Sequence, residues 1–205
     1  ELQNLARSNK EIRVIQLDTT KFDTFDKVAQ EVEKIVGDEG LNCLINNAGI
    51  NMDIPTIDEV TVEALTSHFL TNTVGPIMLA KAFIPLLKKT SSRNSDVSIG
   101  ISRAAVINVT SILGSITLNT EGGFVGYRES KAALNMLSRT LATQLKKDKI
   151  LVTVLHPGWV QTDMGGPNAN LTIDESVNDI VKTLYSLNEK HHAGFVQYDG
   201  KELPW

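Results

Sequence analysis

Short apolar runs alternate with amphipathic segments along the chain, and this alternation constrains the fold more than any other feature. The runs, several of them rich in β-branched residues, lie at 12–17, 41–45, 104–109, 150–156 and 194–200. Segments that are typical of helices separate them at 19–37, 61–89, 125–147 and 174–188. Strands and helices in alternation form a parallel sheet covered on both faces. Residues 1–205 are therefore predicted to form a single α/β domain with a doubly wound sheet.

Two segments carry signals for irregular structure. Gly75 and Pro76 interrupt the long helix predicted at 61–89, and a kink is expected there because proline removes an intrahelical hydrogen bond. The polar stretch KKTSSRNSDVSIGISR at 88–103 predicts a surface loop.

Composition limits the kinds of partner. The formal net charge of the 205 residues is −4, with both signs interspersed, so neither a nucleic-acid-binding surface nor a membrane-binding patch is expected. The longest apolar stretch, VGPIMLAKAFIPLL, contains Lys81 and two prolines and is too broken for an ordinary membrane-spanning helix. The single cysteine, Cys43, permits no intrachain disulfide and favours a reducing compartment. We therefore expect a soluble, cytoplasmic protein that binds small molecules or other proteins.

Residues that follow the predicted strands are candidates for a binding site, because ligands of open parallel sheets bind beyond the carboxyl ends of the strands. These residues are Asp18, Asn46, Asn47, Ala48, Gly49, Ser111, Pro157 and Gly158.

The helix predicted at 125–147 carries the stretch YRESK, which puts Tyr127 and Lys131 one turn apart on one face. A lysine at this distance can lower the pKa of a phenol, which is ordinarily about 10. The same spacing is common on solvated helix surfaces, so the pair has chemical meaning only where other segments converge on it.

The histidines show no spacing to carboxylates or cysteine that would indicate a metal site, so no metal is predicted. His68, His156, His191 and His192 are expected to be structural or surface residues. Trp159 is expected either at the mouth of a substrate site or in the core. Met164 has the same two interpretations.

Five motifs in this order resemble the short-chain dehydrogenase/reductase family. They are NNAG at 46–49, Asn72 in TNTVGP, Ser111 in NVTSILG, the Tyr-x-x-x-Lys of 127–131, and PGWVQTDM from 157. More narrowly, HPGWVQTDMGG and the ending GFVQYDGKELPW resemble the insect Sniffer-type carbonyl reductases and the bacterial C-factor proteins. The resemblance covers nearly the whole chain and implies a Rossmann-like fold.

The resemblance implies a catalytic set. Tyr127 would be the proton donor in carbonyl reduction, and the base in oxidation, with Lys131 lowering its pKa and binding the nicotinamide ribose. Ser111 would orient the substrate carbonyl, unless it is only a turn serine. Asn72 would hold a water that relays protons towards Lys131, unless it is bonded only within its own helix.

The resemblance also implies a nicotinamide dinucleotide, NADP in preference to NAD, which is not excluded. Asp18 would accept a hydrogen bond from the adenine amino group, although it is equally suited to capping the following helix. The NNAG motif would stabilise the sheet and let the backbone approach the adenine ribose. The PGWVQT turn would pass under the nicotinamide and offer it Pro157, Gly158, Val160 and Thr162.

One expected element of the family is absent from the sequence. Residues 1–17 contain no strand, Gly-rich phosphate loop and helix in succession. In the usual strand order 3-2-1-4-5-6, the strands of that unit separate 12–17 from 41–45, so the sheet would have a gap. We therefore expect the chain, which begins at Glu1, to be truncated at the N-terminus and to bind a dinucleotide poorly by itself. A rearranged pairing of 12–17 is the alternative.

The leading functional prediction is the NADP-dependent reduction of small ketones, aldehydes or quinones. A steroid or sugar-alcohol dehydrogenase is a weaker enzymatic alternative. A different class of function is a truncated, non-catalytic family member that acts as a binding or dimerisation module. The helices at 61–89 and 125–147 form the dimer surface in many relatives, so the resemblance leaves a homodimer and a monomer open.

Overall fold

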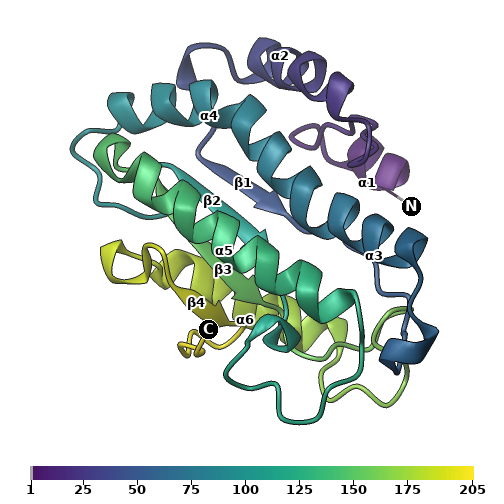
Figure 1. Ribbon diagram of the computed structural model, residues 1–205. Coiled ribbons are helices and arrows are strands. Elements are labelled where there is room, and N and C mark those ends of the chain that lie inside the picture. The colour runs from purple at the N-terminus through teal and green to yellow at the C-terminus, as the bar shows by residue number, and fades with distance from the viewer. Residues whose placement is uncertain (1) are drawn as a thin grey trace.

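The computed structural model describes residues 2–205, and a four-stranded parallel sheet lies at its centre (Figure 1). The strands are β1 (Cys43–Asn46), β2 (Ala105–Val109), β3 (Leu151–His156) and β4 (Phe195–Gln197). They pair in the order β1-β2-β3-β4, and every pair is parallel. The predicted α/β architecture is confirmed.

Six α-helices accompany the sheet in the described part of the chain. Their bounds are α1 (Leu2–Ser8), α2 (Phe25–Val36), α3 (Val62–Phe69), α4 (Gly75–Arg93), α5 (Tyr127–Leu145) and α6 (Ile173–Ser186). A π-helical turn over Leu70–Val74 joins α3 to α4, so the predicted kink takes the form of a widened turn directly before Pro76.

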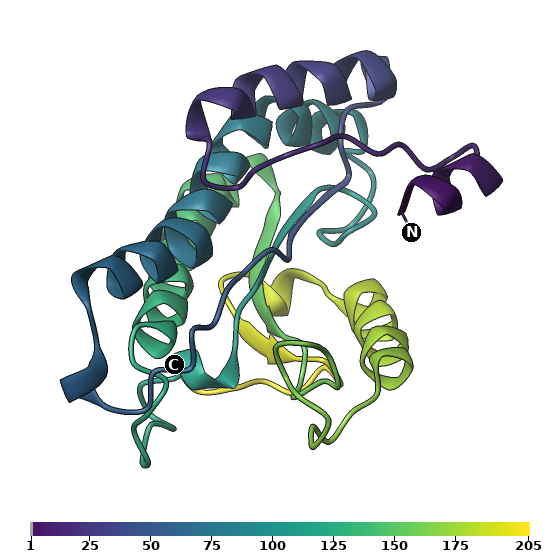
Figure 2. The same ribbon diagram turned by 90° about the vertical axis from the view of Figure 1, so that its right-hand side faces the viewer.

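Helices cover the two faces of the sheet unequally (Figure 2). The helices α2, α4 and α5 pack on one face around Val106, Val152 and the fully buried Leu87. On the other face, Leu184 and Leu187 from α6 and its C-terminal end cover β3 and β4. The side chain of Ile45, on β1, remains 48% exposed on this second face.

Buried polar side chains connect the sheet to α5. Asn46 Nδ2 donates to Asn108 Oδ1 at 2.7 Å, and Asn108 Nδ2 donates to Ser138 Oγ at 2.7 Å. Directly after β2, Thr110 Oγ1 donates to Asn135 Oδ1 at 2.7 Å. These bonds satisfy polar groups that would be costly to bury unpaired, and they fix the height of α5 on the sheet.

The prediction of a strand at 12–17 is wrong. These residues are irregular, and Val14 is 46% exposed. In Figure 2 this segment runs as an extended trace from α1, which stands apart at the right, to the start of α2 at the upper left. A strand needs a neighbour for its backbone hydrogen bonds, and residues 12–17 pair with neither edge of the sheet.

The surface loop predicted at 88–103 is also partly wrong, because α4 continues to Arg93. Thr90 and Ser91 are buried there, although both are polar. The Thr90 hydroxyl donates to the Leu86 carbonyl at 3.1 Å, and the Ser91 hydroxyl donates to the Asp148 carbonyl at 2.6 Å. Backbone acceptors thus allow a polar sequence to remain helical against the core.

The helical stretch Val62–Arg93 is long and apolar enough to cross a membrane by length and composition alone, with a mean hydropathy of 1.4 in its most apolar window. Half of that window is buried inside the fold. A core helix meets the same criterion, so the stretch is weak grounds for a membrane segment.

The buried polar link predicts a stability effect. Replacement of Asn108 by alanine leaves Asn46 and Ser138 without their partner, so Asn108→Ala should lower the free energy of unfolding in urea by about 2 kcal/mol or more. The exposed helix residue Asn178 offers a matched control, and Asn178→Ala should change it by less than about 0.5 kcal/mol. Equal effects of the two substitutions would contradict the structural role of the link.

Candidate active site

Ser111 follows β2 at the carboxyl edge of the sheet and begins a 3₁₀ turn over Ile112–Gly114. Its side-chain oxygen accepts a hydrogen bond from the Leu113 amide at 3.2 Å. This turn is pressed against α5, because a Cβ built on Gly114 would lie 2.9 Å from the carbonyl carbon of Lys131. The close approach requires glycine, and it brings Ser111 beside the start of α5.

Tyr127 and Lys131 lie at the start of α5, one turn apart. Lys131 Nζ donates to the Val109 carbonyl at the end of β2, at 3.0 Å, and lies 5.7 Å from the centre of the Tyr127 ring. Only 9% of Tyr127 and 4% of Lys131 are exposed. The pair is therefore a buried feature and differs from a solvated stripe on a helix surface.

Burial governs the acidity of both side chains. It raises the pKa of the Tyr127 phenol, and a hydrogen bond with the Ser111 hydroxyl acts in the opposite direction. Burial lowers the pKa of the Lys131 ammonium to about 8. The sequence led us to expect a lowered pKa for Tyr127, and the structure gives the opposite direction, because removal from water disfavours the charged form of each group.

Asn72 lies in the π-helical turn and is fully buried. Its Oδ1 accepts from the Ile50 amide at 2.8 Å, and its Nδ2 donates to the Ile50 carbonyl at 2.9 Å and to Ser130 Oγ at 3.0 Å. A Cβ built on Gly49 would lie 3.2 Å from Asn72 Oδ1 and 3.4 Å from Lys131 Nζ. Asn72 and Lys131 therefore meet at Gly49.

Asp18 lies near the same edge of the sheet, although the residues before it form no strand. The carbonyl oxygen of Thr19 would lie 2.6 Å from a Cβ built on Gly75, so this segment crosses the start of α4 closely. The Asp18 carboxylate is exposed and accepts hydrogen bonds from the Thr20 amide and hydroxyl, which lower its pKa. Asp18 thus stabilises a local turn and still presents its carboxylate to solvent.

The NNAG motif divides into a buried and an open part. Asn46 is buried and, besides contacting Asn108, donates from Nδ2 to the Pro76 carbonyl at 3.1 Å. Asn47 and Ala48 are exposed at the carboxyl edge of β1. The first residue therefore holds the sheet together, while the following ones leave open backbone beside Gly49.

Comparison with known proteins identifies the family. A family model described as short chain dehydrogenase matches residues 1–173. The chain belongs to the short-chain dehydrogenase family. Its sequence is 38% identical over 165 residues to the C-signal protein of Myxococcus xanthus, an alignment that covers 80% of this chain and 93% of that protein.

Two solved structures place this short-chain dehydrogenase among carbonyl reductases in overall fold. The carbonyl reductase Sniffer of D. melanogaster superposes with a TM-score of 0.98 and 46% identity, over 100% of this chain and 82% of that one. An NADPH-bound carbonyl reductase from chicken fatty liver superposes with a TM-score of 0.94 and 38% identity, over 100% of this chain and 78% of that one.

The turn after β3 lies at the same edge of this short-chain dehydrogenase. Gly158 has a φ of 88°, and a Cβ there would lie 2.4 Å from Leu171 Cδ1, so the turn requires glycine. The Thr162 hydroxyl donates to the Val160 carbonyl at 3.3 Å and accepts from the Gly165 amide at 3.1 Å. The Pro157 carbonyl, directly after β3, accepts from the Ser176 hydroxyl on α6 at 2.7 Å.

The sequence left open whether two side chains of this turn pack in the core or lie on the surface, and their exposure decides for the surface. Trp159 is 51% exposed and Met164 is 50% exposed, so neither packs in the core. Both lie on the surface next to the candidate site.

Two of the histidines are buried, which agrees with the structural alternative expected from the sequence. His68 has no exposed surface, and both of its ring nitrogens are hydrogen-bonded. His156 ends β3, and its Nδ1 is buried without a partner in the described part of the chain. The full burial of a histidine depends on tertiary packing, so no sequence signal could have revealed it. Within residues 2–205, no three His, Cys, Asp or Glu side chains cluster as metal ligands would.

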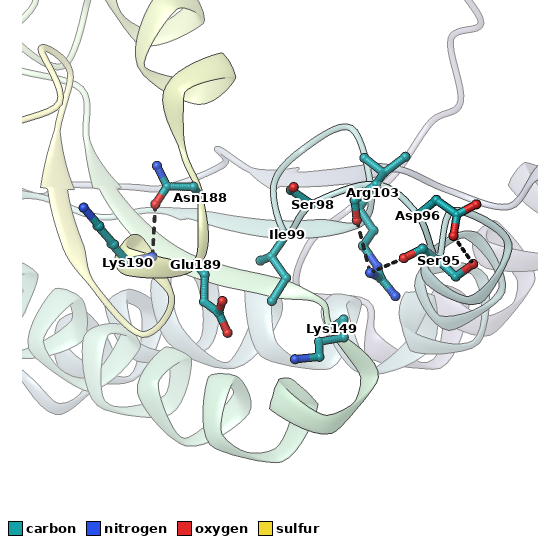
Figure 3. A pocket seen from close by; sticks show the side chains of 10 residues that line it. Ser95, Asp96, Ser98, Ile99, Arg103, Lys149, Asn188, Glu189 and Lys190 are labelled. Carbon is teal, nitrogen blue, oxygen red and sulfur yellow. Dashed lines mark hydrogen bonds between the residues drawn. The ribbon is translucent and has the colours of Figure 1, made fainter.

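A hollow of about 560 Å³ lies elsewhere (Figure 3). It is lined by residues that precede β2, β3 and β4, including Asp96, Arg103, Lys149 and Glu189, at the amino ends of the strands. Arg103 is already bonded to Ser91 Oγ and to two backbone carbonyls. This hollow is therefore separate from the candidate site.

Burial of His156 predicts a pH-dependent stability. Burial lowers the pKa of His156 from 6.5 to about 4, so the unfolded chain takes up this proton first as the pH falls. The contribution to stability is present above pH 6.5 and should fall by roughly 3 kcal/mol as the pH drops through about 4. Urea unfolding at pH 7 and pH 4.5 should show a smaller loss for His156→Gln than for the wild type, whereas the control His191→Gln should follow the wild type. Identical losses in all three proteins would refute this assignment.

Proposed function

We propose that the protein reduces the carbonyl group of small ketones, aldehydes or quinones, with NADPH as the hydride source. The convergence of Asn72 Oδ1 and Lys131 Nζ on Gly49, beside the buried Tyr127, is the observation that carries this proposal. Similarity to an NADPH-bound carbonyl reductase supports the reaction class and favours NADP over NAD.

In the proposed step, hydride adds to the carbonyl carbon while Tyr127 gives its phenolic proton to the carbonyl oxygen, and an alcohol results. A raised pKa keeps the phenol protonated at neutral pH, which suits a proton donor. The Ser111 hydroxyl, which acts to lower the pKa of Tyr127, would orient the carbonyl and stabilise charge on its oxygen. Lys131 and a water held near Asn72 would return a proton to Tyr127.

The residues of the open edge fit the nicotinamide and adenosine parts of such a cofactor. A bound nicotinamide supplies the hydride. The absence of a side chain at Gly49 leaves room at the point where Lys131 Nζ would meet a ribose, and the exposed Asp18 carboxylate could accept from adenine. Asn46, Asn47 and Ala48 would support the backbone on that side. Pro157, Gly158, Val160 and Thr162 would face the carboxamide.

Anchoring of the pyrophosphate requires residues beyond those described. Residues 2–205 contain no Gly-rich turn between a strand and a helix at this edge. We propose that the chain is a part of a longer polypeptide whose phosphate-binding unit pairs with the free edge of β1, the first strand of the sheet, and covers the face on which Ile45 is 48% exposed.

We also propose an oligomeric state and a cellular location for the protein. Met136 on α5 is 66% exposed and Leu137 is 38% exposed, which suits a homodimer formed through α4 and α5. A cytoplasmic location suits the unpaired Cys43.

The first test combines the intact mass of the natural protein with NADPH binding followed by fluorescence. A mass above 22.4 kDa by about 4 to 5 kDa, the size of a βαβ unit, with saturable NADPH binding is expected. Tyr127→Phe should retain binding and lose turnover of a model quinone by about 10²- to 10⁴-fold. Tyr185→Phe is the matched control, because Tyr185 is 74% exposed on α6 and should leave turnover unchanged.

The opposite outcome supports the other class of function. A natural mass of 22.4 kDa without nucleotide binding would reject the reductase proposal and favour a non-catalytic binding or dimerisation module.

The pH dependence of turnover gives a separate prediction. Because the pKa of Lys131 is about 8 and that of Tyr127 lies above its ordinary value, kcat/KM for carbonyl reduction should fall as the pH rises past about 8. Lys131→Arg keeps the positive charge and should move this fall to higher pH. A profile that stays flat to pH 10 in the wild type would exclude Lys131 as the titrating group.

A further inference from the structure

His68 lies at the C-terminal end of α3, one helical turn before Asn72, and has no exposed surface. Nothing in the proposed reaction uses it. Its position next to Asn72 nevertheless places it against two segments that border the site, residues 50–52 and the start of α5.

The partners of His68 determine which of its nitrogens carries the proton. Nδ1 lies 2.9 Å from the Ala64 carbonyl oxygen, which can only accept, so Nδ1 bears the hydrogen. Nε2 lies 3.1 Å from the Met52 amide, which can only donate, so Nε2 is the acceptor. The imidazole is therefore neutral, with its proton on Nδ1.

His68 and Asn72 together fasten the segment that leaves Gly49. Asn72 makes two hydrogen bonds to the backbone of Ile50, and His68 makes one to the backbone of Met52. Three bonds from α3 and the π-helical turn that follows it thus hold Ile50 and Met52, the two ends of the segment 50–52. Because Gly49 directly precedes this segment, its place beside Lys131 depends on this attachment.

The other side of the imidazole contacts the start of α5. A Cβ built on Gly126, which has a φ of 86°, would lie 2.8 Å from His68 Nδ1. The rings of His68 and Tyr127 meet edge to face, with centroids 6.4 Å apart. His68 therefore lies between residues 50–52 and the start of α5 and contacts both, so its size sets the distance between them.

We propose that His68 is a positioning residue, whose neutral imidazole sets the distance between Tyr127 and the Gly49 edge of the site. This inference rests on the proposed carbonyl reduction, since it assigns His68 an effect on the proton donor of that reaction. Displacement of a reacting group by about 1 Å can cost as much as 10²-fold in rate, so loss of the attachment should lower kcat more than it changes KM.

Two substitutions at position 68 distinguish loss of the hydrogen bond to the Met52 amide from loss of the packing of the imidazole. The carbonyl oxygen of glutamine reaches about as far as Nε2, so His68→Gln can still accept from the Met52 amide. The shorter His68→Asn retains only a donor for the Ala64 carbonyl. The full natural protein should show a kcat at least about tenfold lower for His68→Asn than for His68→Gln, with KM changed by less than about threefold.

Amide hydrogen exchange at Met52 provides a readout that needs no turnover. The amide should be protected in the wild type and in His68→Gln, and should exchange freely in His68→Asn. The melting temperatures of the two variants should be similar, since each loses one hydrogen bond of the imidazole.

The outcomes distinguish the two proposals. Equal kcat values for the two variants, or equal protection of Met52, would overturn the positioning role. If the wild-type protein has no carbonyl reductase activity while Met52 shows the expected exchange pattern, the proposed function fails and only the attachment of residues 50–52 stands.

Discussion

The packing of α5 against β2 is the contact on which the candidate site depends. Lys131 donates to the carbonyl that ends β2. On the following turns of the same helix, Asn135 and Ser138 bond the side chains of Thr110 and Asn108. All three links join one helix face to one strand, so a slip of α5 along the sheet would break them together and leave several buried polar groups unpaired. The position of Tyr127 follows from this register.

Burial at that contact also sets the chemistry. A free tyrosine titrates slightly below a free lysine, but removal from water raises the pKa of Tyr127 and lowers that of Lys131 to about 8. The order of the two groups is therefore reversed, and Lys131 is the one that loses its proton near physiological pH. In the proposed reaction, a Tyr127 phenol that stays protonated would serve as the proton donor for the carbonyl oxygen.

The scaffold is shared with relatives, and exposed apolar side chains border its candidate site. The backbone of the Sniffer carbonyl reductase superposes over the whole chain with a TM-score of 0.98. Around the site, Met52, Trp159 and Met164 are each about half exposed, with values of 47%, 51% and 50%. In the proposed carbonyl reduction, these large apolar side chains would favour apolar carbonyl compounds as substrates, because burying such surface is favourable.

Most of the strands and helices could be predicted from the chain alone, because hydrophobic periodicity and glycine or proline signals are local. The roles predicted for Ser111 and Tyr127 came from the resemblance to a family and stay predictions. Residues 12–17 were misread, since a β-branched run becomes a strand only beside a partner. The burial of His68 and the direction in which the pKa of Tyr127 shifts could not be predicted from the sequence either. Hydrogen-bond partners and removal from water arise between segments distant in sequence, and only their packing in three dimensions determines them.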